Sequence, residues 1–268
     1  MGDAAPVRLL FSDVDRTLLT QDHRLPDEIV AAVGRARAAG LKMVLATARS
    51  PRGVAPYARR LGLADLVICF NGGWIGSLDE RPLETLPLER EPAVEAMRLA
   101  AGLGIHPMWY GDDAIYALDA DPVTRREAET THERLVVVAD PAEIPGAPGK
   151  IMCVRTDLAR PDEFDAMRAA FGGVFGIVPS HARLLEINPP GVGKAVGAAR
   201  AARHLGIDAA HCAAAGDAEN DLAMLRWAAV PITVANGLPE LRALAAHVGR
   251  SCDEAGMAGA IDWLLARR

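Results

Sequence analysis

The side chains best suited to chemistry in this sequence are Asp13 and Asp15, which follow the short apolar run Leu9-Leu10-Phe11. Such a run is typical of a buried strand that places polar groups at its carboxyl end. Because side chains alternate along a strand, residues two apart start out on the same side of it. Two carboxylates that close repel one another, so one stays protonated or a cation lies between them. The pair therefore suits a hard cation such as Mg²⁺, although aspartates are also common in turns and helix caps.

Polar side chains also stand at the ends of other predicted elements: Thr47, Lys194, Asp217, Asn220 and Asp221. In an open α/β sheet, ligands bind at the carboxyl ends of the strands. Each residue also has an ordinary structural reading, because threonine caps helices, lysine is usually solvated, and aspartate begins turns and helices. Thr47, for example, could cap the helix that begins near Pro51. Taken together, however, they could place several polar groups near Asp13 and Asp15 at one edge of the sheet.

The elements that must position these residues alternate between strand and helix. In the first part of the chain, strands and helices are expected in turn over residues 9–12, 26–39, 41–46, 51–61 and 66–70. The alternation returns after residue 190, with a helix over 194–204, a strand over 211–215, a helix over 219–227, a strand over 230–234, and helices from 239 and over 256–265. Crossovers of this kind imply parallel pairing, so the expected fold class is α/β with a doubly wound, mainly parallel sheet.

Between about residues 81 and 185 the rhythm changes to paired strands with interspersed helices. A helix over 89–103 is followed by an expected β-hairpin over 105–118. Further elements are expected over 122–132, 135–138, 151–154, 162–171, 174–178 and 183–187. This pattern indicates an inserted α+β domain with an antiparallel sheet. The predicted organisation is a core domain in two parts, residues 1–80 and 186–268, interrupted by an inserted domain of residues 81–185.

The composition narrows the function classes. A net charge of −6 argues against a general electrostatic grip on nucleic acid or an anionic membrane surface. No apolar run approaches the length of a bilayer span, and the first six residues lack the character of a secretory signal, so we expect a cytoplasmic protein. The 4 cysteines and 7 histidines lack disulfide or metal-ligand spacing and are expected to be structural or surface residues. For its oligomeric state we expect a monomer or a weak homodimer.

The sequence resembles the haloacid dehalogenase-like (HAD) phosphatases of the Cof subfamily. Four motifs occur in the family's order: Asp13-Val14-Asp15-Arg16-Thr17-Leu18-Leu19, Ala46-Thr47-Ala48-Arg49, Gly193-Lys194 and Gly216-Asp217-Ala218-Glu219-Asn220-Asp221. The tail from Val234 to Met257 is also similar, so the resemblance covers essentially the whole chain. It implies a Rossmann-like core, with residues 81–185 forming the α+β cap domain of this subfamily.

The resemblance implies a Mg²⁺-dependent phosphatase that hydrolyses a small phosphomonoester, such as a sugar phosphate or related metabolite, through an aspartyl-phosphate intermediate. Asp13 would be the nucleophile, and Asp15 would be the general acid and then the general base. Thr47 would donate a hydrogen bond to the transferring phosphoryl group, and Lys194 would supply positive charge to it.

The resemblance also implies the residues that hold the cofactor and the substrate. Mg²⁺ would bind Asp13, the backbone carbonyl of Asp15 and Asp217. Asp221 would support this metal shell or orient Lys194. The candidate substrate contacts are Arg16, Arg49, Asn71, Gly72 and Asn220.

The chain departs from the Cof pattern at Arg16 and Ala48, where the family usually has glycine. Neither change removes a reacting group. We expect Arg16 to face the mouth of the site and favour substrates with a second anionic group, although it could equally be a surface arginine. Two other functions stay open: a phosphomutase or phosphotransferase acting on sugar phosphates, and a regulator that binds phosphorylated metabolites without turnover.

Overall fold

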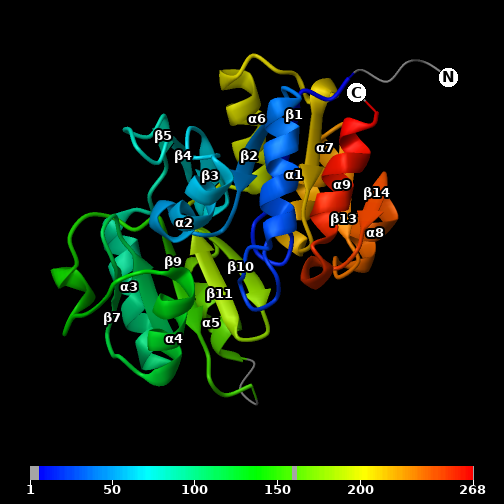
Figure 1. Cartoon of the computed structure of the whole chain (residues 1–268). Coiled ribbons are helices and arrows are strands. Elements are labelled where there is room, and N and C mark those ends of the chain that lie inside the picture. Colours follow the sequence, from blue (N-terminus) through cyan, green and yellow to red (C-terminus); the bar gives the residue numbers. More distant parts are fainter. Residues whose placement is uncertain (1–5, 159–161, 268) are drawn as a thin grey trace. The chain divides into compact units, whose positions relative to one another are not determined.

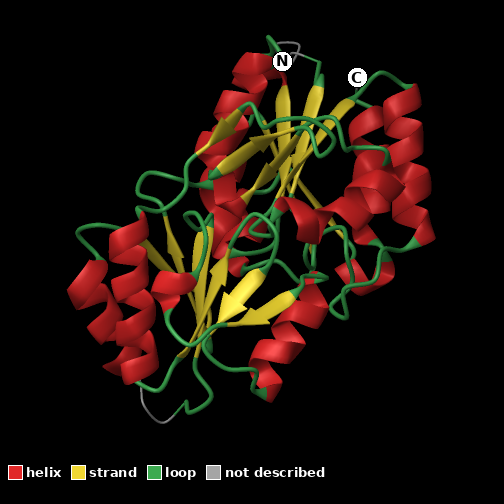
Figure 2. Ribbon diagram, turned by 90° about the vertical axis from the view of Figure 1, so that its left-hand side faces the viewer, coloured by secondary structure: helices red, strands yellow, loops and turns green. Residues whose placement is uncertain are grey.

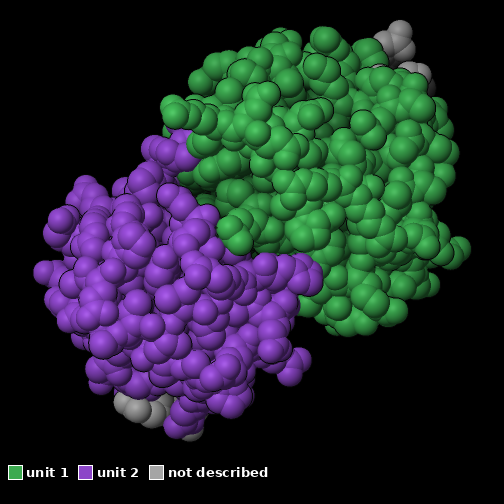
Figure 3. All heavy atoms as spheres, turned by 60° about the vertical axis from the view of Figure 1, so that its left-hand side comes forward, with its two compact units in different colours: residues 1–83, 193–268 green, residues 84–192 purple. Residues whose placement is uncertain are grey.

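The structure, a computed structural model, describes residues 6–158 and 162–267. Most of its helices and strands are labelled in Figure 1, and Figure 2 distinguishes helices from strands by colour. The chain divides into two compact units, one of residues 1–83 and 193–268 and one of residues 84–192 (Figure 3). The first unit is therefore assembled from two separate stretches of sequence.

The sheet of the first unit has the strand order β14-β13-β12-β1-β2-β3-β4-β5. Its parallel strands are β1 (Leu9–Ser12), β2 (Lys42–Ala46), β3 (Val67–Cys69), β12 (Cys212–Ala215), β13 (Val230–Val234) and β14 (His247–Gly249). Strand β4 (Trp74–Gly76) pairs antiparallel to β3, and β5 (Glu84–Thr85) follows at the edge, where the chain enters the second unit. Because β1 lies between β2 and β12 and runs parallel to both, polar residues after these three strands gather at one edge of the sheet.

Helices cover both faces of this sheet (Figure 2). On one face lie α1 (Asp27–Ala38), α2 (Pro51–Leu61) and α9 (Gly256–Leu265), and on the other lie α6 (Lys194–His204), α7 (Leu222–Trp227) and α8 (Pro239–Leu244). Leu10 of β1 belongs to the first of these apolar clusters, whereas Leu9 and Phe11 belong to the second. This doubly covered, mainly parallel sheet confirms the predicted fold class.

The second unit is an α+β module. Its sheet has the order β10-β11-β9-β6-β7-β8, with strands β6 (His106–Tyr110), β7 (Ile115–Ala117), β8 (Leu135–Val137), β9 (Lys150–Val154), β10 (Gly176–His181) and β11 (Leu184–Asn188). The helices are α3 (Arg90–Gly102), α4 (Pro122–Thr131) and α5 (Asp162–Phe171). Apolar residues of α3 and α5 pack on one face of the sheet against Trp109, Ile151 and Leu185.

The structure differs from the sequence-based expectations in several places. Strand β8 pairs parallel to β7, because α4 crosses over between them, so the second sheet is mixed rather than antiparallel. Strands β4, β5 and β14 were not expected. The expected helix over residues 219–227 begins with a 3₁₀ turn, Glu219–Asp221, and becomes regular only at Leu222. Strand β11 runs on to Asn188, and the second unit ends at residue 192, later than the predicted boundary at 185.

Among the described residues, no helix is both long enough and apolar enough to cross a lipid bilayer.

Candidate active site

The carboxyl end of β1 carries Asp13, which is almost fully buried. The backbone N–H of Asp13 donates to the carbonyl of Ala215 on β12 at 2.9 Å, so the parallel pairing continues past the end of β1. Beyond Asp13 the chain turns, and the amides of Leu18 and Leu19 both donate to the carbonyl of Val14. This turn brings the residues after Asp13 back over the edge of the sheet.

Lys194 joins three distant parts of the sequence. It is the first residue of α6, its side chain is buried, and its Nζ donates to Oδ1 of Asp13 at 2.6 Å and to Oδ1 of Asp221 at 2.7 Å. The other oxygen of Asp221, Oδ2, accepts from the amides of Asp217 and Ala218. These hydrogen bonds hold the loop after β12 in a turn, and the regular helix α7 begins only after Asp221, at Leu222. Lys194 is therefore an enclosed charge rather than the solvated lysine that is usual on a helix.

The carboxyl oxygens of Asp13, Asp217 and Asp221 lie within 4.8 Å of one another. Burial raises the pKa of Asp13 well above its ordinary value; Lys194 opposes this rise, and the neighbouring carboxylates add to it. Burial and the charge of Asp221 raise the pKa of Asp217 to about 6. Burial alone would lower the pKa of Lys194, but Asp13 and Asp221 raise it above its ordinary value. One lysine thus faces three buried carboxylates, an excess of negative charge that fits a divalent cation bound by oxygen ligands.

Asp15 has a different environment from Asp13. Its carboxylate accepts two hydrogen bonds from the buried Arg49, from Nε to Oδ2 at 2.8 Å and from Nη2 to Oδ1 at 2.7 Å. The Nδ1 atom of His23 lies 2.9 Å from Oδ1 of the same carboxylate. Burial alone would raise the pKa of Asp15, but the hydrogen bonds from His23 and Arg49 outweigh it and hold the pKa well below its ordinary value. Asp15 is therefore held as an ionised carboxylate.

Arg49 is itself fixed by the start of α2. Its guanidinium lies over the ring of Tyr57, 5.1 Å from the centroid, and Nη1 donates to the carbonyl of Gly53. The sequence indicated Arg49 as a substrate contact, whereas in the structure its guanidinium faces Asp15. His23 was not among the candidate residues, and only its place in a polar loop after the two aspartates could have suggested it.

Thr47 is fully buried after β2, and its hydroxyl accepts from the amide of Arg49 at 3.1 Å. The helix that follows is capped by Ser50, whose hydroxyl accepts from the amide of Gly53, so the helix-cap reading of Thr47 is wrong. The carbonyl of Thr47 also accepts from the amide of Asn71. Thr47 therefore lies inside the loop network that follows β2 and β3.

Asn71 and Gly72 both have backbone conformations in the left-handed region, with φ of 54° and 103°. The side-chain oxygen of Asn71 accepts from Nδ2 of Asn220 at 3.1 Å, so two of the candidate substrate contacts bind each other. A Cβ atom on Gly72 would come within 2.7 Å of the carbonyl oxygen of Gly193. Glycine at this position thus allows the loop after β3 to approach the residue directly before Lys194.

Arg16 also has a positive φ, 58°, which is unusual for a residue other than glycine. Its carbonyl accepts from the side chain of Asn236 at 2.9 Å, and Oδ1 of Asn236 accepts from the amide of Cys252. The Nε of Arg16 lies 3.8 Å from Oδ2 of Asp217, and about half of the Arg16 side chain is exposed. Arg16 therefore brings a partly solvated positive charge beside the acidic cluster.

Comparison with known proteins matches the family of haloacid dehalogenase-like hydrolases over residues 10–261. The “Putative phosphatase” of Streptococcus pyogenes serotype M6 is 32% identical and aligns with 97% of this chain and 99% of its own length. The HMP-PP phosphatase of Serratia proteamaculans is 26% identical, with 88% of this chain and 87% of that protein aligned. A solved haloacid dehalogenase-like hydrolase from Bacteroides thetaiotaomicron has a TM-score of 0.90 at 22% identity, covering 96% of this chain and 99% of that one. The structure described as the sugar phosphatase BT4131 has a TM-score of 0.82 at 21% identity, and the match covers 96% of this chain and 98% of that one.

Proposed function

Because this chain belongs to the haloacid dehalogenase-like hydrolases and is a phosphatase of that family, we propose that it hydrolyses a small phosphomonoester through an aspartyl-phosphate on Asp13. The observation that carries the proposal is the contact of Lys194 with Asp13 at 2.6 Å inside a buried group of three carboxylates. We further propose that the substrate is a sugar phosphate, because one structure with the same fold is described as a sugar phosphatase.

Asp13 is proposed as the nucleophile. A carboxylate oxygen of Asp13 forms a bond to phosphorus while the bond from phosphorus to the ester oxygen breaks. Both partners are negatively charged, so the attack requires positive charge and hydrogen-bond donors around the phosphoryl group. Lys194 supplies the charge, and the hydroxyl of Thr47 supplies a hydrogen bond.

Asp15 is proposed to act first in its protonated form, giving that proton to the departing alkoxide, and the carboxylate so formed later takes a proton from the water that attacks the aspartyl-phosphate. The ionised state that Arg49 and His23 favour suits the second of these steps. Arg49, whose two hydrogen bonds orient the carboxylate, is proposed as a positioning residue for Asp15. The direct substrate contact expected from the sequence stays a prediction.

The proposed cofactor is Mg²⁺, held by Asp13, Asp217 and the backbone carbonyl of Asp15. The excess of buried negative charge around Asp13 supports this choice, and hard oxygen ligands suit the ion. When bound, Mg²⁺ supplies the charge that neutralises an oxygen of the transferring phosphoryl group. Both oxygens of Asp221 already accept hydrogen bonds, so we assign it to orienting Lys194 and the loop at Asp217.

Substrate recognition in the first unit is proposed to involve Arg16 and the linked pair Asn71 and Asn220. The charge of Arg16 would favour a substrate with a second anionic group. The Asn220 amide would turn one of its donors towards the phosphoryl group while the other holds Asn71. Gly72 would contribute through the close approach of its backbone to Gly193 rather than through a side chain.

Phosphate release from a panel of phosphorylated metabolites tests this proposal, with each compound assayed in Mg²⁺ and in EDTA. Metal-dependent release from one or a few sugar phosphates is the expected result. Assays with an added sugar acceptor distinguish hydrolysis from transfer, because a transferase would form a new phosphate ester instead of free phosphate. Release that persists unchanged in EDTA would contradict the proposed cofactor.

A further inference from the structure

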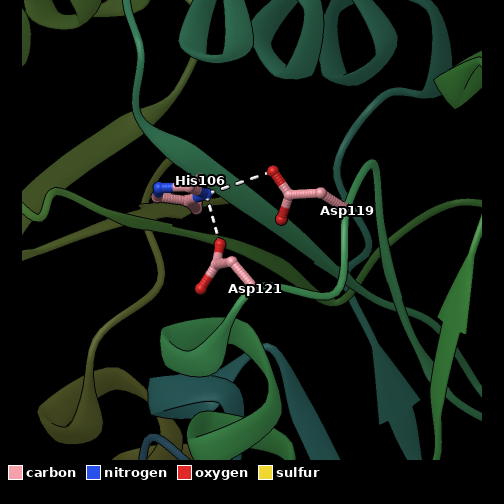
Figure 4. Close-up of side chains that lie close together, drawn as sticks. All are labelled: His106, Asp119 and Asp121. Atoms are coloured by element: carbon pink, nitrogen blue, oxygen red, sulfur yellow. Dashed lines mark hydrogen bonds and ion pairs between the residues drawn. The ribbon is translucent and has the colours of Figure 1, made fainter.

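A histidine and two aspartates meet within the second unit, in a place that the chemistry at Asp13 does not use (Figure 4). His106 begins β6, and Asp119 and Asp121 lie in the loop between β7 and α4. The Nδ1 atom of His106 is 3.2 Å from Oδ2 of Asp119 and 2.5 Å from Oδ2 of Asp121. One imidazole nitrogen is thus aimed at an oxygen of each of two carboxylates.

The fold orients both carboxylates before any ligand is considered. Asp121 caps α4, and its Oδ1 accepts from the amides of Val123 and Thr124, which turns Oδ2 towards His106. The fully buried Thr124 also donates its hydroxyl to Oδ2 of Asp121 at 3.1 Å and lies 3.5 Å from Oδ1 of Asp119. Hydrogen-bonded support of this kind is characteristic of the groups that surround metal ligands.

The cluster places two carboxylates against one imidazole nitrogen. Burial alone would raise the pKa of Asp121, but the amide of Thr124 and the other hydrogen bonds hold it below its ordinary value, so Asp121 is ionised at neutral pH. Within the described part of the chain, no lysine or arginine contacts either carboxylate, and the neighbouring Arg125 donates to the carbonyl of Ala120.

We propose that Nδ1 of His106 and the carboxylates of Asp119 and Asp121 form a binding site for a divalent transition-metal ion, of which Zn²⁺ is the representative. One imidazole and two carboxylates form a donor set that Zn²⁺ uses and that Mg²⁺, with its preference for oxygen, does not. The ion supplies positive charge beside both carboxylates. Asp119 is about half exposed, which leaves the site open to entry from solvent and to a water ligand.

Bound metal would join the start of β6 to the loop before α4. In the sequence, His106 is 13 residues from Asp119 and 15 residues from Asp121. Because the ion binds the folded cluster and the unfolded chain lacks a preformed site, Zn²⁺ is expected to raise the thermal midpoint of the protein. The site is independent of the proposed phosphatase chemistry and requires none of its residues.

The test counts bound Zn²⁺ after chelation and equilibrium dialysis of the full chain, in the wild type and in His106→Gln and Asp119→Asn. Asp119 is the safer position for folding, since its substitution leaves the α4 cap intact. Each variant is expected to bind one Zn²⁺ fewer than the wild type, and to lose part of the Zn²⁺-dependent rise in the thermal midpoint. His204→Gln, at an exposed position on α6, is the matched control and keeps the wild-type count. Equal counts in the wild type and both variants would overturn the proposal and leave the cluster as an ion pair at a helix cap.

Discussion

The guanidinium of Arg49 donates two hydrogen bonds, 2.8 and 2.7 Å long, to the carboxylate of Asp15. Asp15 follows Asp13, the aspartate that contacts Lys194, by two residues. The pKa values of Asp13 and Asp15 are shifted in opposite directions. The pKa of Asp13 lies above its ordinary value because of burial, whereas the pKa of Asp15 lies below it because hydrogen bonds from His23 and Arg49 outweigh burial. Carboxylates whose environments separate their pKa values in this way commonly have different roles in catalysis.

Replacing Arg49 with methionine tests whether it positions Asp15. For an alkyl phosphate, kcat/KM is expected to fall about 10²-fold or more, the range typical of acid–base assistance. An aryl phosphate with a good leaving group needs no proton at that oxygen, so its loss should be smaller. Arg59→Met, at an exposed position on the same helix, is the control. Equal losses for both esters would instead indicate that Arg49 acts in binding the phosphoryl group.

Lys194→Met should abolish turnover and destabilise the fold. It leaves Asp13 and Asp221 buried without their shared cation, and removing one member of a buried ion pair costs about 3–5 kcal/mol. Urea unfolding in EDTA measures this free energy, with Arg203→Met on the exposed side of α6 as the control. A variant as stable as the wild type would show that the contacts of Lys194 contribute little to folding.

Removing the metal is expected to stop phosphate release, and restoring Mg²⁺ should recover it. Asp217→Asn should raise the half-saturating concentration of Mg²⁺ by about 10-fold or more, a loss of about 1.4 kcal/mol or more in binding free energy. Mg²⁺ should also stabilise the wild-type protein by about 2.7 kcal/mol at 100 times its dissociation constant. Asp208→Asn, at an exposed position, is the matched control. An unchanged Mg²⁺ requirement in Asp217→Asn would remove Asp217 from the proposed ligand set.

Two substitutions of Arg16 distinguish the effect of its backbone conformation from the effect of its charge. Arg16→Gly relieves a left-handed conformation and should stabilise the fold by up to about 1 kcal/mol. Arg16→Asn keeps a residue that tolerates this conformation and removes the charge alone. Both variants are expected to lose kcat/KM selectively for substrates with a second anionic group. If the ranking of substrates stays the same in both, Arg16 does not select among them.

Much of the fold could be predicted from the sequence because local patterns and tertiary structure agree. The helix predicted over residues 256–265 is α9, Gly256–Leu265, and the strand predicted over 230–234 is β13, Val230–Val234. The apolar runs that end in Asp13, Thr47 and Asp217 are the strands β1, β2 and β12. Their parallel neighbours bring these polar residues to one edge, as the strand–helix alternation indicated.

The remaining features depend on contacts that a linear pattern does not contain. The side chain of Arg49 turns to Asp15, 34 residues away, and His23 reaches the same carboxylate from a loop. The histidines lack metal-ligand spacing in the sequence and were expected to be structural or surface residues. His106 nevertheless lies beside Asp119 and Asp121, because β6 and the loop after β7 are neighbours in space. Strand β14 is short and only partly buried, so it lacks the apolar run that marks the central strands.

A phosphorylated Asp13 is the most direct sign of the proposed mechanism. The enzyme is mixed with an aryl phosphate and Mg²⁺, quenched with acid within the first turnovers, and digested for mass spectrometry of the peptide that contains Asp13. Asp15→Asn should accumulate the phosphoryl group on Asp13, because its hydrolysis lacks the general base while the aryl leaving group still departs. Asp13→Asn should carry no phosphoryl group and release no phosphate. Phosphate release by Asp13→Asn at the wild-type rate, or a phosphoryl group on a different residue, would contradict the mechanism.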